Sequence, residues 1–210
     1  RVVALDPGIR TFLTGFSPGQ TFKIAEGDFA RIARLGVHLD RLLSKVAKAR
    51  ADQKHRYKAA ASKLRWKIKD LIDELHFKSV RFLVDNFDLI LLPTFATKQM
   101  SARLNRKIKA KSVRSLLGFA FFRFGMRLEN AAKLVGKTVL RVNEAYTSKT
   151  ASWTGEIVKI GSAKQITSQG ITLDRDVNGA RGIFLRALVD SPSLSSVQQA
   201  PNLTTKLQFV

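Results

Sequence analysis

Three carboxylates stand where an α/β sheet places its chemistry. Asp6 follows an unbroken apolar run and precedes a Pro-Gly turn, which predicts the carboxyl end of a strand in the middle of a sheet. Glu144 ends a second aliphatic run, and Asp176 falls in the first turn of a predicted helix. Carboxylates that share one edge repel each other unless cations neutralise them, and their hard oxygens suit Mg²⁺ or Mn²⁺. Two such ions about 3.5–4 Å apart can activate a water and stabilise the leaving oxygen of a phosphodiester.

The elements around these acids predict how they meet. Strands are expected from β-favouring runs at residues 1–6, 11–16, 21–25, 87–93 and 138–144. The first three form an antiparallel meander with the first strand innermost, and the last two follow helical segments and should run parallel to it. A final helix begins near Asp174, and Gly179 and Gly182 let it approach a sheet closely. One of Asp174 and Asp176 is expected to cap this helix. The order of elements predicts an α/β, RNase H-like fold, a mixed sheet flanked by helices.

Residues 28–86 show a helical period and predict two long helices that form a hairpin, with Asp28 as N-cap. The middle of the segment is strongly basic and includes Lys63, Arg65 and Lys67, with Trp66 among them as a stacking surface. This composition favours contact with phosphates. The alternative is a charged helical face that is only solvated.

The overall charge supports a polyanionic partner. The formal net charge is +21 and the pI is about 10.9, for which nucleic acid is the leading explanation and a membrane surface the rival. No apolar run is long enough to span a bilayer. Cysteine is absent, which excludes disulfides and thiolate metal ligands. Because Arg1 already belongs to a predicted strand, we expect further domains upstream.

Three motifs carry a resemblance to a known family. Residues 4–8, 146–150 and 174–180 resemble motifs of the RuvC nuclease portion of TnpB proteins and of their eukaryotic and viral relatives, the Fanzor proteins, with a closer likeness to Fanzor. The resemblance implies an RNA-guided DNA endonuclease of RuvC type in which Asp6, Glu144 and Asp176 are catalytic and bind Mg²⁺, for which Mn²⁺ can substitute. It implies guide RNA, target DNA and upstream wedge and recognition domains as partners, and no membrane. It implies a nuclear location for a eukaryotic Fanzor-like protein and a cytoplasmic one otherwise.

The sequence departs from the family at two places. Most TnpB proteins carry the RuvC glutamate at the strand end that here reads Leu92-Pro93, so we transfer that role to Glu144. The family usually has a four-cysteine zinc ribbon before the last aspartate, whereas Ala151 and Thr154 occupy the first pair of positions here. No zinc is therefore expected.

The domains follow from these assignments. We expect a nuclease in two parts at residues 1–27 and 87–190, the hairpin insertion at 28–86, a loop-like, cysteine-free insert at about 145–173, and a poorly ordered tail at 191–210. Lys149, Arg175 and Arg181 are candidates to position the scissile phosphate. Three alternatives stay open: a guided DNA-binding protein that no longer cuts, a guide-independent RNase H-like nuclease or transposase, and a basic RNA-binding module whose acids are only caps and turns.

Overall fold

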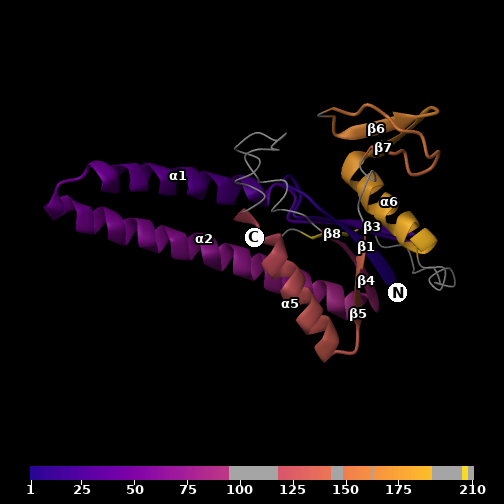
Figure 1. Cartoon of the computed structure of the whole chain (residues 1–210), viewed down its shortest axis with the longest axis horizontal. Helices are drawn as coiled ribbons and strands as arrows, with labels where there is room; N and C mark the ends of the chain where they lie inside the picture. Colours follow the sequence, from indigo (N-terminus) through magenta and orange to yellow (C-terminus); the bar gives the residue numbers. More distant parts are fainter. Residues whose placement is uncertain (95–117, 143–148, 162, 191–204, 208–210) are drawn as a thin grey trace.

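The computed structural model describes residues 1–94, 118–142, 149–161, 163–190 and 205–207 (Figure 1). Its elements are β1 (Val2–Pro7), β2 (Leu13–Ser17), β3 (Gln20–Ile24), α1 (Asp28–Lys48), α2 (Ala51–Asn86), β4 (Leu89–Pro93), α5 (Phe121–Leu134), β5 (Thr138–Val142), β6 (Gln165–Ser168), β7 (Ile171–Asp174), α6 (Arg175–Asp190) and β8 (Thr205–Leu207). Candidate residues at 95–117 and 143–148, Glu144 among them, lie outside the described part of the chain.

A mixed sheet organises the described part of the molecule. Six strands lie in the order β5-β4-β1-β2-β3-β8, with β1 antiparallel to β2 and parallel to β4, and β4 parallel to β5. This arrangement confirms the predicted α/β fold, its meander and its two parallel crossovers. The structure differs from the sequence-based expectation in two segments. Residues 165–168 and 171–174 of the loop-like insert pair as a hairpin, and residues 205–207 of the tail pair with β3.

The two faces of the sheet are covered by different helices. Val3 and Leu5 of β1 belong to the core cluster that includes residues of α2 and α5, whereas Val2 and Ala4 pack with residues of α6. Side chains alternate between the faces along a strand, so Asp6 is directed to the α6 side. The side of the sheet that meets α6 is therefore the one on which the predicted chemistry must lie.

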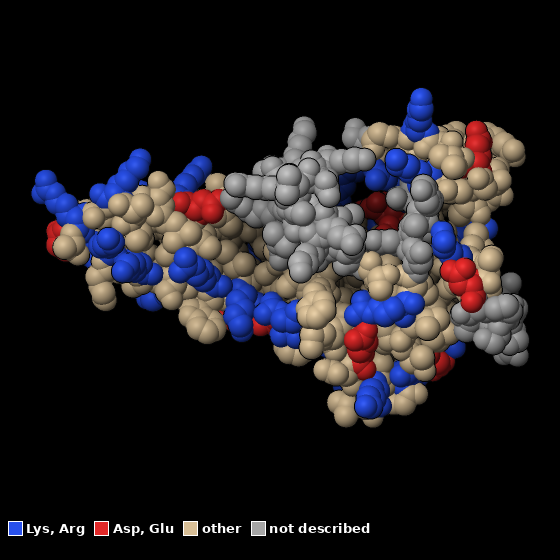
Figure 2. All heavy atoms as spheres, viewed as in Figure 1, with Lys and Arg blue, Asp and Glu red and all other residues tan. Residues whose placement is uncertain are grey.

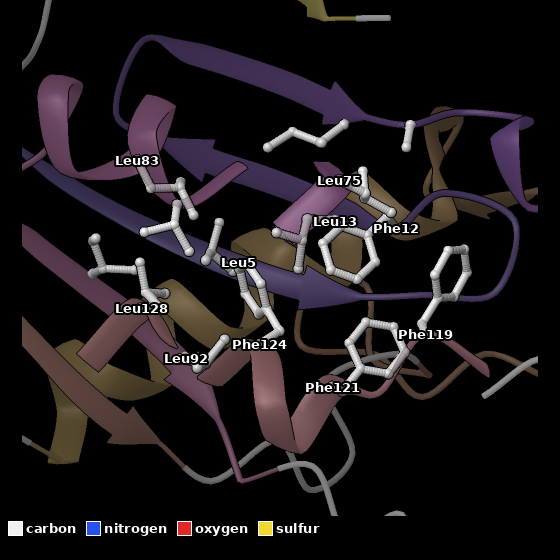
Figure 3. Packing of buried hydrophobic residues seen from close by; sticks show 14 of the residues in the cluster. Leu5, Phe12, Leu13, Leu75, Leu83, Leu92, Phe119, Phe121, Phe124 and Leu128 are labelled. Carbon is white, nitrogen blue, oxygen red and sulfur yellow. The ribbon is translucent and has the colours of Figure 1, made fainter. Parts of the chain in front are cut away.

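Aromatic rings fill the α2–α5 side of the core (Figure 3). The ring of Phe12 stacks on that of Phe121 at 5.2 Å between centroids and meets Phe119 and Phe124 at 5.1 Å. The spacing of the phenylalanines at 119, 121, 122 and 124 predicts that all four are core residues, and these contacts confirm the prediction for Phe119, Phe121 and Phe124. The prediction is wrong for Phe122, which is 74% exposed, because the helical turn points it away from the sheet.

A buried histidine ties α2 to the segment before α5. His76 is fully buried; its Nε2 lies 2.8 Å from the Phe119 carbonyl oxygen and its Nδ1 lies 3.2 Å from Arg127 Nη1. Arg127 also donates to Asp73 at 2.8 Å. Because the guanidinium can only donate, Nδ1 accepts and Nε2 carries the proton. Burial lowers the pKa of His76 to about 4, so the ring is neutral at pH 7.

Helices α1 and α2 form the predicted hairpin, which projects from the sheet (Figure 1). The 36 residues of α2 correspond to a helix of about 54 Å. The N-cap of α1 is Gly27 rather than Asp28, because Gly27 adopts a φ of 89° that favours glycine. Among the described helices, no segment is long and apolar enough to cross a membrane.

Candidate active site and nucleic-acid interface

Asp6 meets helix α6 at a glycine. A Cβ built on Gly179 would lie 2.5 Å from Asp6 Oδ2 and 3.2 Å from its Cγ, which is too close for any side chain. Gly179 is buried, and the absence of a side chain lets α6 approach the end of β1 at this point. The close approach predicted from the glycines of this helix is thus located at the candidate catalytic aspartate.

Asp176 lies one helical turn before Gly179, on the same face of α6. Its neighbour Asp174 is the cap, since Asp174 Oδ1 accepts hydrogen bonds from the backbone N–H groups of Asp176 at 2.9 Å and Val177 at 3.1 Å. Burial raises the pKa of Asp176, and the carboxylate of Asp174 raises it further. Asp176 is therefore the carboxylate that is left for other chemistry, and a cation at its side would favour its ionised form.

Lys23 holds the carboxylate of Asp174 in place. It projects from β3 and donates to Asp174 Oδ2 at 2.9 Å and to Glu26 Oε1 at 3.2 Å, with 19% of its side chain exposed. Burial lowers the pKa of Lys23, but the hydrogen bonds to Asp174 and Glu26 outweigh it, so the pKa is raised overall. Burial by itself would raise the pKa of Asp174. The hydrogen bonds from Lys23 and from the Val177 N–H outweigh this effect, so the pKa of Asp174 is lowered overall. The pair is thus ionised, which neutralises one carboxylate beside Asp176.

The parallel strands end level with Asp6. Ala4 is paired with Leu91, and Pro93 with Val142, so Asp6, Pro93 and Val142 stand at one height of the sheet. Val142 packs in the same cluster as Ile183 of α6. β5 is described as far as Val142, and the predicted strand end at Glu144 lies outside the described residues. Within the described residues, no three histidine, aspartate or glutamate side chains are grouped to hold a metal ion.

The insert is held by a polar cluster at the place where the family has a zinc ribbon. Ser168 Oγ donates to Glu156 Oε2 at 2.6 Å and lies 3.0 Å from Thr154 Oγ1, and Trp153 Nε1 donates to the Ser168 carbonyl at 3.2 Å. Ala151 is fully buried and donates its N–H to the Glu156 carbonyl at 2.8 Å. Ala151 has no side-chain donor atom, so these residues do not fit a tetrahedral zinc site. Hydrogen bonds and burial instead connect residues 151–156 to Ser168 of β6.

Polar side chains of α6 fasten this insert to the helix. Asn178 is fully buried; its Nδ2 donates to the Thr150 carbonyl and its Oδ1 accepts from the Ser152 N–H, each at 2.9 Å. Arg181 Nη1 donates to Ser152 Oγ at 2.8 Å, and Arg175 Nη1 donates to the Gly161 carbonyl at 3.3 Å. The two arginines that the sequence predicts to position a phosphate therefore hold the insert against α6 in the structure.

The remaining predicted contacts with nucleic acid lie on the surface. Lys149 is exposed at the start of the described insert. Lys63, Arg65 and Lys67 are exposed in the middle of α2, where Arg65 lines a hollow beside the start of α5, and Trp66 between them is 60% exposed. The structure places this basic segment on a different part of the molecule from Asp6 and Asp176 (Figures 1 and 2).

Sequence reasoning missed a cleft beside Asp176. Its lining includes Arg10 from the β1–β2 connection, Lys23 from β3 and Lys164 from the insert. Lys23 alone carried a local signal, since it alternates with the buried residues Phe22 and Ile24 and must face the α6 side. Nothing in the sequence near Arg10 or Lys164 indicates that the fold brings them together.

Similar proteins agree with the motifs and the fold. Residues 121–183 match the family model described as the Cas12f1-like TNB domain. The chain is 27% identical over 191 residues to the TnpB-like protein L79 of Acanthamoeba polyphaga mimivirus, with 86% of this chain and 36% of that protein covered. It is 29% identical over 207 residues to the putative transposase R186 of the same virus, with 95% and 42% covered.

A solved structure supports the fold. The cryo-EM structure of the Cas12f1-sgRNA-target DNA complex matches with a TM-score of 0.58 at 18% identity, over 86% of this chain and 48% of that one. The chain spans less than half the length of the curated relatives named above. The narrower likeness to Fanzor proteins stays a prediction. Three motifs in order, a matching domain model over residues 121–183 and a matching fold make this chain similar to the TnpB-like proteins.

Proposed function

We propose that this chain is the nuclease portion of an RNA-guided DNA endonuclease in which Asp6, Glu144 and Asp176 bind Mg²⁺. The observation that carries the proposal is the approach of Gly179 to Asp6, because it brings the end of β1 to the helical face on which Asp176 lies. The similarity to TnpB-like proteins supports the same activity.

The donor set suits a hard divalent cation. Asp6 and Asp176 offer carboxylate oxygens from two rigid elements, a central strand and the first turn of a helix. Glu144 lies outside the described residues, two positions after the last residue of β5, and the family resemblance gives it the role of the RuvC glutamate. We therefore assign Glu144 as the third ligand.

Each residue has a distinct part in the proposed reaction. Bound Mg²⁺ would lower the pKa of a water and stabilise the charge that develops on a phosphodiester. Asp6 and Asp176 would hold the ion, and Asp174 would stay occupied as helix cap and partner of Lys23. Asp176 is half-buried, and its partial removal from water strengthens its attraction to a cation.

Single substitutions at the acids test the proposal. Asp6→Ala and Asp176→Asn, made in the complete protein with its RNA, should abolish Mg²⁺-dependent cleavage of a labelled target DNA and leave DNA binding in EDTA within a few-fold. The matched control is Asp190→Ala, in the same helix but about 21 Å along its axis from Asp176. Cleavage by Asp6→Ala at the wild-type rate would reject the assignment.

The same assay separates the alternative functions. A guided binder that no longer cuts would bind target DNA and show no product at any Mg²⁺ concentration. A guide-independent nuclease, which the name of the putative transposase R186 brings into consideration, would cut after nuclease treatment had removed co-purified RNA.

A further inference from the structure

We infer that the cleft between β3, the start of α6 and the insert binds the backbone of the single DNA strand to be cut, with Arg10 and Lys164 as its phosphate contacts. The inference rests on the proposed nuclease function and adds the path by which the strand reaches Asp176. It also gives the insert a role, because Lys164 belongs to that segment and Arg10 to the sheet.

The cleft has the size and position for this role. Its volume is about 420 Å³, within the range of about 300–1,000 Å³ found for ligand sites, and it lies where two parts of the fold meet. Asp174 and Asp176 line one side, and Gly27 and Ala30, at the start of α1, line another. Figure 2 shows acidic atoms in a hollow below the β6–β7 hairpin, with basic atoms along its upper side.

The charges in the cleft are arranged so that a phosphate can approach the acids. Lys23 is bonded to both Asp174 and Glu26, which offsets much of their repulsion toward an anion. Arg10 and Lys164 are exposed and contribute positive charge from two different parts of the fold, the β1–β2 connection and the insert. An anion between these two cations would lie next to Asp176, where the metal ligands are proposed.

The walls of the cleft are fixed by the backbone. The Gly27 N–H donates to the Arg10 carbonyl at 3.1 Å, and the Arg175 N–H donates to the Lys164 carbonyl at 2.9 Å. Both cationic residues are thereby anchored to neighbouring elements, one to the start of α1 and one to the start of α6. Little conformational entropy is left to lose in the backbone when a ligand binds.

The chemistry favours a strand of nucleic acid over a small ligand. Small-molecule pockets contain few charged groups, whereas six of the ten residues that line this cleft have ionisable side chains. DNA is favoured over guide RNA because the cleft leads to Asp176, and a nuclease must bring the bond it cuts to its metal ligands.

Salt dependence of DNA binding tests the cleft without requiring cleavage. The probe is a fluorescein-labelled single-stranded oligodeoxynucleotide that does not pair with the guide, bound in EDTA to the complete protein with its RNA. Each lost phosphate contact reduces the slope of log K against log salt by about 0.7 for single strands. Lys164→Gln should therefore reduce the slope by about 0.7, and Arg10→Gln with Lys164→Gln by about 1.4.

Two control variants keep the test specific. Lys159→Gln removes an exposed lysine of the same insert that does not line the cleft, and its slope should be that of the wild type. Lys164→Arg keeps the charge and should keep the slope. The inference is overturned if Lys164→Gln behaves like Lys159→Gln, or if the cleft variants lose affinity for guide RNA while their DNA slope stays unchanged.

The outcome for the cleft is separable from the outcome for the nuclease. A reduced slope in a protein that does not cut DNA with Mg²⁺ would support the DNA cleft and refute the proposed function. An unchanged slope in a protein whose cleavage depends on Asp6 would refute the cleft and support the function.

Discussion

A methyl group at position 179 should disable cleavage while the protein stays folded. In Gly179→Ala the new Cβ would lie 2.5 Å from Asp6 Oδ2, where ordinary contacts begin near 3.4 Å. Either the carboxylate or α6 must move by about 0.9 Å. A misplacement of about 1 Å at a reacting group costs about 10²-fold in rate, so we expect the cleavage rate to fall by about that factor.

The expected effect on stability is much smaller. Alanine is favoured over glycine inside a helix by about 0.5–1 kcal/mol, and overpacking costs about 1–3 kcal/mol. The free energy of unfolding should therefore fall by no more than about 2.5 kcal/mol. The matched control is Gly36→Ala in α1, where a Cβ would meet nothing within 4 Å, and which should gain stability and cut normally.

The assay combines single-turnover cleavage of a labelled target DNA with urea unfolding of both variants. Loss of cleavage with retained folding would show that the spacing between β1 and α6 matters for the reaction. If Gly179→Ala cut at the rate of Gly36→Ala, the placement of Asp6 against α6 would be irrelevant to function and our reasoning would be wrong.

The remaining predictions concern stability and the insert. The pKa of His76 is lowered to about 4 in the folded protein, so the unfolded chain binds a proton first as pH falls below 6.5. The free energy of unfolding should therefore drop between pH 6.5 and pH 4 by about 3 kcal/mol more in the wild type than in His76→Gln. Urea unfolding of both proteins at several pH values measures this difference. Ser168→Ala removes the hydrogen bond to the Glu156 carboxylate and the contact with Thr154. It should destabilise the insert by about 1.5–3 kcal/mol. Relative to the wild type, amide exchange should become faster in β6 and β7 and stay unchanged in β4. Zinc chelators should leave that exchange unchanged in the wild type, and accelerated exchange on chelation would contradict a metal-free insert. Replacing Lys67 on α2 by Gln should weaken nucleic-acid binding and reduce its salt slope without changing the cleavage rate at saturation, and an unaltered slope would favour a merely solvated helical face.

The sequence by itself determined the strands around Asp6, the long helical pair and the helix that begins at Arg175, because these depend on local periods and on turn chemistry. Alternation, helical spacing and Pro-Gly signals act over a few residues, and the chain follows them closely. The sequence also indicated that Asp174 or Asp176 would be a cap, and the hydrogen bonds of Asp174 show which one it is.

Only the tertiary structure decided which distant groups became neighbours. Lys23 and Asp174 are 151 residues apart, yet they are bonded because α6 packs on β1 and β2 and so places its cap, Asp174, beside β3. The hairpin within the insert and the outward direction of Phe122 were likewise missed. Such contacts are fixed by packing and register across the whole sheet, and no local pattern in the sequence encodes them.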